Sequence, residues 1–377
     1  MNVSFVSGVC VEHDAISNSI REEIQWLTKA GYHVRLFTYR CDYKDLPYKQ
    51  VGGLADVMYD PHYRHSDLIV WHFGVHYPLF NLLFIAPTRA KKVVVFHNIT
   101  PKQFVPESAH ADIDLSFSQM SNIAVADQVV CDSDVNKEVL SAAGIDIPSI
   151  TLPLAIRNNL QAPVAKPSFS DNVSRIAFVG RFVRSKGVIE LLEAIRRVMA
   201  DDAQAKIQLD LVGNLDFSDP VVLDALQSLM QRLRQDFHGR LAITLRGNAK
   251  ESEKQAVLAD ADLFVLPTYH EGFCVPILEA LASGCRVVAY DNSNVPFISG
   301  ELADLVPTGD IGVLAKTMRD VLSQIGEPAW TNGSKYRTFI DQAGRHVARF
   351  HPKTIEADFL RFVDSMVRPL DTRERLI

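Results

Sequence analysis

The chain has 377 residues, 47% of them hydrophobic and 22% charged, which is enough to bury two hydrophobic cores, so two domains are expected. A net charge of -6 argues against a nucleic-acid-binding protein, in which a concentrated basic surface is typical, so no nucleic acid is expected as a partner. The five cysteines are an odd, scattered set that makes a poor disulfide framework and fits a reducing cytoplasm.

In the first half of the chain, apolar runs of strand length alternate with helical periodicity, which is typical of a doubly wound parallel sheet. A strand is predicted at 3–7, and nothing in these first residues resembles a signal peptide. The following helix has apolar residues from Ile16 to Leu27 and is expected to end at Gly31. Residues 1–160 are therefore expected to form one α/β domain, with further strands at 34–38, 68–71, 93–96 and 128–131 and with Ser133 as a helix N-cap.

The apolar pattern lapses at 157–172 into sequence rich in Asn, Pro and Ser, and we place a linker at 161–172. A second α/β domain is expected over 173–345, with Asp310 as a possible helix cap. Residues 346–377 are expected to be a helical segment that packs back towards the N-terminal domain. The strands predicted in this half lie at 175–180, 207–212, 241–245, 263–266 and 286–290.

One motif in the second half places two carboxylates around the start of a helix, Glu271 in a loop and Glu279 in the first turns. Pro276 suits the first helical position, and Gly284 can close the helix. A helix N-terminus presents unpaired N–H groups and a partial positive charge, which favour phosphate or sugar oxygens. The backbone groups expected to point at such a ligand are those of Phe273, Cys274 and Val275.

A second loop, after the strand at 175–180, carries the opposite charge through Arg181 and Lys186. Ligands of doubly wound sheets bind at the carboxyl ends of the strands, where both loops are expected to lie. Carboxylates suit hydroxyl groups and cations suit phosphates. Together the two loops therefore indicate a nucleotide sugar as the ligand.

In this order the motifs resemble the retaining nucleotide-sugar glycosyltransferases of family four, of the bacterial surface-polysaccharide type. Residues 271–279 look like the family's E-x7-E signature, and 179–187 are similar to the basic pair that grips the donor diphosphate. The sequence His-Asn-Ile-Thr-Pro at 97–101 resembles the N-domain histidine motif of many bacterial members. The resemblance covers essentially the whole chain and implies the GT-B fold, two Rossmann-like domains facing a central cleft.

The resemblance implies transfer of a hexose, with retention, from a nucleoside diphosphate sugar such as GDP-mannose or a UDP-sugar. Arg181 and Lys186 would stabilise the leaving diphosphate, Glu271 would hold sugar hydroxyls, and His97 would reach the sugar or phosphate. The other partner would be a glycan acceptor, lipid-linked as in lipopolysaccharide synthesis, at the inner face of the cytoplasmic membrane. No cofactor and no metal would be required. The implied donor-binding residues are Gly180, Gly272, Phe273, Cys274, Val275, Glu279, Asp14 and Ala15.

Three positions depart from the family pattern. Many relatives have a Gly-Gly loop near the donor phosphates, whereas residues 13–18 here read His-Asp-Ala-Ile-Ser-Asn. Relatives often have Gly where this chain has Cys274, and Glu where it has Phe297. Neither of these last two changes removes a charged group that the reaction obviously needs.

Plainer interpretations stay open beside these. Glu271 and Glu279 could be surface or capping acids, the basic loop could be solvated, and His97 could be a hydrogen-bonded structural residue. Cys274 is expected to be a packing residue and not a nucleophile. A sugar-nucleotide epimerase, a glycosidase and a non-catalytic binding subunit are the rival functions. Residues 89–92, which contain three basic side chains, could touch anionic lipid or form a solvated helix end.

Overall fold

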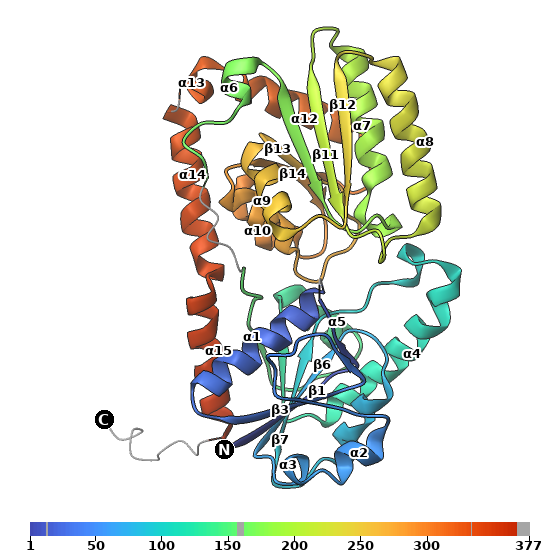
Figure 1. Ribbon diagram of the computed structural model, residues 1–377, viewed down its shortest axis with the longest axis vertical. Helices are drawn as coiled ribbons and strands as arrows, with labels where there is room; N and C mark the ends of the chain where they lie inside the picture. Colours follow the sequence, from blue (N-terminus) through green and yellow to red (C-terminus); the bar gives the residue numbers. More distant parts are fainter. Residues whose placement is uncertain (13, 157–161, 333, 368–377) are drawn as a thin grey trace. The chain divides into compact units, whose positions relative to one another are not determined.

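The computed structural model describes residues 1–12, 14–156, 162–332 and 334–367, which fall into two compact units (Figure 1). Unit 1 comprises residues 1–99, 108–155 and 350–377, and unit 2 comprises residues 100–107 and 156–349. This division differs from the sequence-based one in three places. The segment 100–107 and the described part of the expected linker, 162–172, belong to unit 2, and the C-terminal segment of unit 1 begins at 350 instead of 346.

Unit 1 contains a seven-stranded parallel sheet in the order β5-β3-β1-β6-β7-β8-β9 among its described residues. The strands predicted from apolar runs are all present. The short strands β2, β4, β5 and β9 were not predicted. The strands are β1 Asn2–Val6, β2 Val9–Cys10, β3 His33–Thr38, β4 Arg40–Cys41, β5 Tyr48–Gln50, β6 Leu68–Phe73, β7 Lys91–Phe96, β8 Gln128–Cys131 and β9 Ser149–Thr151.

The helices of unit 1 cover this sheet. Helix α1 begins after Asp14 and ends before Gly31. Gly31 has a φ of 88°, the left-handed conformation expected of a glycine that ends a helix, so the predicted end is confirmed. Ser133 caps α5, since its side chain accepts from Asn136 N, as predicted. The helical segments are α1 Ala15–Lys29, α2 Leu54–Met58, α3 Pro61–Arg64, η1 Pro78–Ile85, α4 His110–Met120, η4 Ser121–Val125, α5 Asp134–Ala142 and α15 Pro352–Val367.

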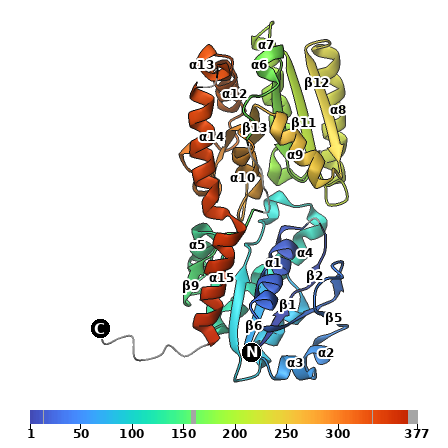
Figure 2. The ribbon, with the colours of Figure 1, turned by 60° about the vertical axis from the view of Figure 1, so that its left-hand side comes forward.

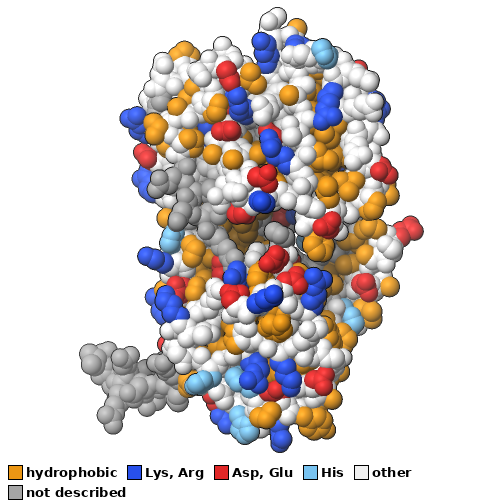
Figure 3. All heavy atoms as spheres, viewed as in Figure 1, with side chains coloured by type: hydrophobic (Ala, Val, Ile, Leu, Met, Phe, Trp, Pro, Cys, Tyr) orange, Lys and Arg blue, Asp and Glu red, His pale blue; other side chains and the backbone are white. Residues whose placement is uncertain are grey.

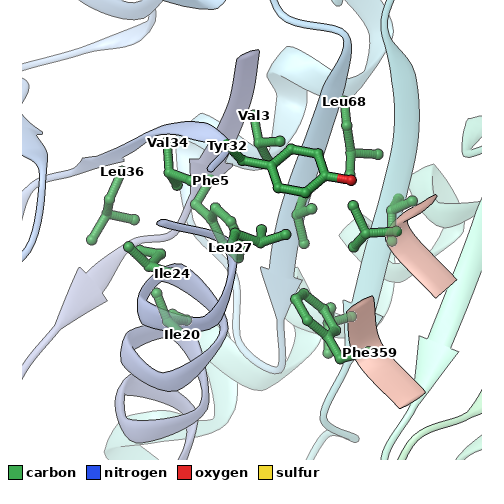
Figure 4. Packing of buried hydrophobic residues seen from close by; sticks show 14 of the residues in the cluster. Val3, Phe5, Ile20, Ile24, Leu27, Tyr32, Val34, Leu36, Leu68 and Phe359 are labelled. Atoms are coloured by element: carbon green, nitrogen blue, oxygen red, sulfur yellow. The ribbon is translucent and has the colours of Figure 1, made fainter. Parts of the chain in front are cut away.

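The core of unit 1 joins the beginning of the chain to its C-terminal helix. Ile20, Ile24 and Leu27 recur along one face of α1 and are fully buried against the sheet. Figure 4 shows these side chains beside Phe5 of β1, with Phe359 of α15 at the same core. Helix α15 lies beside α1 in both ribbon views (Figures 1 and 2), and the Trp26 and Phe359 rings are 5.9 Å apart. The C-terminal helix is thus part of unit 1.

Unit 2 contains a six-stranded parallel sheet in the order β12-β11-β10-β13-β14-β15 among its described residues. From β10 the chain first adds β11 and β12 on one side of the sheet. It then returns and adds β13, β14 and β15 on the other side of β10, which is the doubly wound order. Strand β15 was not predicted. The strands are β10 Ser174–Val179, β11 Ile207–Gly213, β12 Leu241–Gly247, β13 Leu263–Leu266, β14 Arg286–Asp291 and β15 Ala303–Pro307.

Two helices of unit 2, α10 and α12, begin where the sequence indicates. Asp310 caps α12 by accepting from Val313 N at 2.9 Å, and Pro276 lies in the first turn of α10. The predicted α/β class with two doubly wound parallel sheets is confirmed. The helical segments are η2 Lys102–Phe104, α6 Ser168–Asp171, η5 Arg184–Lys186, α7 Val188–Asp201, α8 Pro220–Asp236, α9 Glu251–Asp260, α10 Val275–Ala282, α11 Val295–Ser299, η6 Gly300–Leu302, α12 Ile311–Ile325, α13 Pro328–Thr331 and α14 Ser334–Val347.

Candidate functional site

The candidate site lies at the carboxyl ends of β10 and β13, the two neighbouring strands at which the order of the unit 2 sheet reverses. Ligands of doubly wound sheets bind outside this switch point, because the loops that follow the two strands diverge there. The loop after β10 runs over 180–187 and contains Arg181 and Lys186. The loop after β13 runs over 267–274 and contains Glu271. The structure thus brings the two predicted loops together within unit 2.

Lys186 and Glu271 form an ion pair in this site. The Lys186 Nζ donates to Glu271 Oε1 at 2.6 Å, and the two side chains are only 18% and 9% exposed. The resemblance implies that Lys186 binds a phosphate and Glu271 binds sugar hydroxyls, so direct contact between the two side chains was not predicted. Partial burial strengthens the attraction between the two charges, and it also costs each of them hydration. A phosphate that binds Lys186 would break this ion pair. The Glu271 carboxylate, directly beside the phosphate, would then be able to accept from another ligand group.

Glycine is required directly after Lys186. Gly187 has a φ of 67°, and a Cβ at this position would lie 1.9 Å from the Pro267 carbonyl oxygen. The two loops are also joined by hydrogen bonds to the Ser185 carbonyl, from Thr268 Oγ1 at 3.0 Å and from Tyr269 N at 2.7 Å. Because backbone packs directly on backbone, the position of Lys186 is fixed relative to the loop that carries Glu271.

Cys274 occupies a strained position between Glu271 and helix α10. Its φ of 82° lies in the left-handed region that favours glycine, the residue that the resemblance leads one to expect at this position. Asn294 is fully buried, and its Nδ2 donates to the Phe273 carbonyl at 3.0 Å, which holds the loop on its other side. Burial, followed by the charge of Glu271, raises the pKa of the Cys274 thiol well above its usual value. A buried thiol of this kind is not a nucleophile.

The second predicted carboxylate, Glu279 of α10, is paired with a lysine that the sequence analysis missed. Lys254 of α9 donates to Glu279 Oε1 at 2.7 Å and also lies 3.0 Å from Glu251. Burial lowers the pKa of Lys254, but the attraction of these two carboxylates outweighs burial and leaves the pKa above its usual value. No local motif marks Lys254, because it meets Glu279 only through the packing of α9 near α10.

Arg181 and Gly180 lie at the start of the first loop. The Arg181 side chain is exposed and makes no hydrogen bond or ion pair in the described part of the chain, and Gly180 is half-buried. Arg184, by contrast, forms an ion pair with Glu190, and its guanidinium lies 5.0 Å from the centre of the Tyr269 ring. Arg181 is therefore the basic side chain of this loop that can turn to a ligand without breaking an existing interaction.

The segment 100–107 adds an aromatic side chain to unit 2. The Phe104 ring lies 5.8 Å from that of Tyr269 and 6.4 Å from that of His270, measured between centroids. Burial is the largest influence on His270 and lowers its pKa. Phe104 was not predicted, because a single aromatic residue about 165 positions before its partners gives no periodic signal.

The remaining predicted residues, Asp14, Ala15 and His97, lie in unit 1. Asp14 is the N-cap of α1, where its carboxylate accepts from both the backbone N and the hydroxyl of Ser17 at 2.8 Å, and Ala15 is the first helical residue. His97 is buried at the end of β7, with both ring nitrogens already engaged by His72 and Asp132. This geometry favours the structural interpretation of His97.

Comparisons with known proteins find similarity to glycosyl transferases in the second half of the chain. Residues 173–324 match the family model described as "Glycosyl transferases group 1". The chain is 28% identical to an MMP alpha-(1->4)-mannosyltransferase of Mycolicibacterium hassiacum over 39% of this chain and 34% of that one. It is 24% identical to an O-antigen chain mannosyltransferase B of Escherichia coli, over 41% and 37%. The chain thus spans little more than a third of the length of these curated relatives.

The fold also has close counterparts among solved structures. A sucrose-phosphate synthase of Thermosynechococcus elongatus superposes with a TM-score of 0.70 over 97% of this chain and 99% of that one, at 19% identity. A likeness at this identity shows the fold alone, which is GT-B with two Rossmann-like domains. The matched segment 173–324 contains the whole sheet of unit 2 and both loops of the candidate site.

Proposed function

We propose that the protein is a retaining hexosyltransferase. The premise is that residues 173–324, which match the glycosyl transferase group 1 model, form a domain of that kind. Its donor is a mannose-type or glucose-type nucleoside diphosphate sugar, and its acceptor is a hydroxyl of a growing, lipid-linked cell-surface glycan. The observation that carries the proposal is the Lys186–Glu271 pair at the switch point, where a phosphate and a sugar can be bound side by side. The mannosyltransferase names of the relatives support the choice of sugar.

The chemistry rests on the charge that develops when the nucleoside diphosphate leaves. Negative charge grows on its β-phosphate as the glycosidic bond stretches, and fixed cations stabilise that charge more in the transition state than in the ground state. Lys186 and Arg181 supply those cations. Glu271 and the backbone of 272–275 hold the sugar hydroxyls, and Glu279 holds the ribose. The leaving phosphate takes the acceptor proton in a front-face reaction, so the proposal needs neither a protein base nor a metal.

The arrangement of the carboxylates does not favour a glycosidase. A glycosidase directs two carboxyl groups at one glycosidic bond. Here Glu271 and Glu279 each accept a hydrogen bond from their own lysine, Lys186 and Lys254. An epimerase would use the same donor site, and it is distinguished by converting the sugar nucleotide when no acceptor is present.

The donor class is tested by thermal-shift titration with GDP, UDP, GDP-mannose and UDP-glucose, using free mannose and glucose as controls. A nucleoside diphosphate sugar at about 100 times its Kd is expected to raise the free energy of unfolding by about 2.7 kcal/mol. Stabilisation by one base and its sugars identifies the donor. A folded protein that none of the nucleotides stabilises contradicts the proposal.

We propose further that the enzyme works as a peripheral protein on the cytoplasmic face of the membrane. No helix in the described residues is long and apolar enough to cross a membrane. On the face shown in Figure 3, basic and acidic side chains are interspersed. Phe84 and Ile85 at the end of η1 are exposed, and the basic residues at 89–92 follow them, although Arg89 forms an ion pair with Asp67. Co-sedimentation with anionic but not with neutral phospholipid vesicles is the expected result.

A further inference from the structure

Four buried side chains of unit 1 form a continuous hydrogen-bonded chain that the proposed reaction does not use. Glu23 Oε2 lies 3.1 Å from His72 Nε2, His72 Nδ1 lies 2.9 Å from His97 Nε2, and His97 Nδ1 lies 2.7 Å from Asp132 Oδ2. Glu23 lies in α1 and His72 in β6, whereas His97 and Asp132 directly follow β7 and β8, and all four are buried. This series of hydrogen bonds therefore connects one helix with three neighbouring strands.

The number of protons shared by these four side chains follows from their three hydrogen bonds. Each of the three contacts joins two heteroatoms and needs one proton between them. Two ionised carboxylates supply no proton, and two neutral imidazoles supply only two. Three hydrogen bonds therefore require one proton more than the neutral histidine pair carries. Without it, the two facing nitrogens of His72 and His97 are both unprotonated, or one carboxylate loses its donor.

The histidines are the groups expected to carry this proton. Free imidazole binds a proton about two pH units more readily than a carboxylate does. The charged groups that act on His97 are Asp132, Glu23 and Asp14, all of them acidic. Burial lowers the pKa of His97, but these carboxylates outweigh burial and raise it above its usual value. The flanking Phe5 ring, 5.9 Å from that of His72, adds an apolar face and no charge.

We propose that His72 and His97 bind one extra proton between them, clamped by Glu23 and Asp132, and that this proton holds α1 to strands β6, β7 and β8. It can lie on either ring, since moving it along the central bond exchanges the charged and neutral imidazoles. The inference concerns unit 1 alone and does not depend on the proposed transfer reaction.

A pH dependence of stability follows. A histidine pKa that is raised by folding contributes stability that is fully present below the unfolded pKa of about 6.5. This stability is lost as the pH rises through the folded pKa. Unit 1 is therefore expected to become less stable as the pH rises above about 6.5, by up to tenfold per pH unit in the ratio of folded to unfolded protein.

The direct test counts protons in the unaltered protein. In the full chain labelled with 15N-histidine, nitrogen NMR at pH 6 to 7 distinguishes protonated from unprotonated ring nitrogens. His72→Gln and His97→Gln variants assign the signals. We expect three protonated nitrogens among the four of this pair. Only two would overturn the proposal, because the extra proton would then be absent or would lie on a carboxylate.

The second test follows unit 1 by fluorescence. Trp26 and Trp71 lie in unit 1 and Trp330 in unit 2, so a Trp330→Phe background reports on unit 1. We expect its unfolding in denaturant to become easier between pH 6.5 and 9, and His72→Gln to abolish this trend. His33→Gln, at an exposed histidine, is the control and should behave as the background does. An unchanged trend in folded His72→Gln would overturn the proposal. If that variant does not fold, the proton count decides.

Discussion

Sugar transfer by an Arg181→Ala, Lys186→Ala double variant is expected to fall at least a hundredfold below that of the unaltered protein. A single preorganised group that stabilises transition-state charge contributes about 3 to 4 kcal/mol, so the loss of either cation should lower turnover by two or more orders of magnitude. Arg181 is exposed and unpaired in the described structure, so its removal leaves the packing intact. Turnover is measured with the donor that the thermal-shift panel identifies.

The control must separate lost catalysis from lost structure. Lys186→Ala leaves the buried Glu271 carboxylate without its partner, which destabilises the loop by itself. A Lys186→Met, Glu271→Gln pair removes both charges and tests that effect, while Arg196→Ala removes an exposed arginine from the surface of α7. Melting temperatures of all variants are compared. Full activity in the folded double variant would refute the proposed role of the basic loop.

Lys166→Met is expected to lower the free energy of unfolding by about 3 kcal/mol, since hydrogen bonds from a charged donor are strong and buried carbonyls that lose a donor are costly. The Leu258 carbonyl still accepts from Cys285 Sγ at 3.1 Å, so the cost arises mainly at Ala259 and Ser283. Lys166 is buried, and its Nζ donates to the carbonyl oxygens of Leu258, Ala259 and Ser283 at 3.3, 2.8 and 2.7 Å. These oxygens terminate α9 and α10, the helices that carry Lys254 and Glu279. The ammonium group thus caps two helix ends whose carbonyls have no partner within their own helices.

Chemical denaturation followed by fluorescence in a Trp26→Phe, Trp71→Phe background, in which Trp330 reports on unit 2, measures this effect. Lys206→Met is the matched control, because it removes the same side chain from an exposed position in the same unit. It should change stability by less than about 0.5 kcal/mol, as surface substitutions usually do. A Lys166→Met variant as stable as Lys206→Met would show that the carbonyls find other partners.

Apolar runs predicted the framework of both sheets because buried parallel strands are nearly all hydrophobic. The strand LIVWHF at Leu68–Phe73 is buried at every position, so its apolar sequence alone identifies it as a strand. The strands that escaped prediction have no such run. Tyr48–Gln50 is a short strand at the edge of its sheet with exposed residues at both ends, and Ala303–Pro307 contains one fully buried residue. Their pairing depends on the sheet already being present.

The candidate site was predictable as a set of residues but not as a set of contacts. Glu271 and Lys186 follow predicted strands, so their edge of the sheet could be inferred. Their direct ion pair could not, because loop conformations depend on the approach of Gly187 to Pro267. The burial of Lys166 had no local signal either. It lies among Ala, Pro and Ser residues that are typical of a linker.

The packing of α15 into unit 1 has a consequence for how the protein is made. Phe359, Phe362 and Val363 complete the core of unit 1, yet a ribosome synthesises them only after the whole of unit 2. At about 5 to 20 residues per second, the nascent first unit must wait for roughly 10 to 40 s with part of its apolar surface uncovered. During that interval unit 2 can finish folding first. The second unit in the sequence would then be the first to reach its native state.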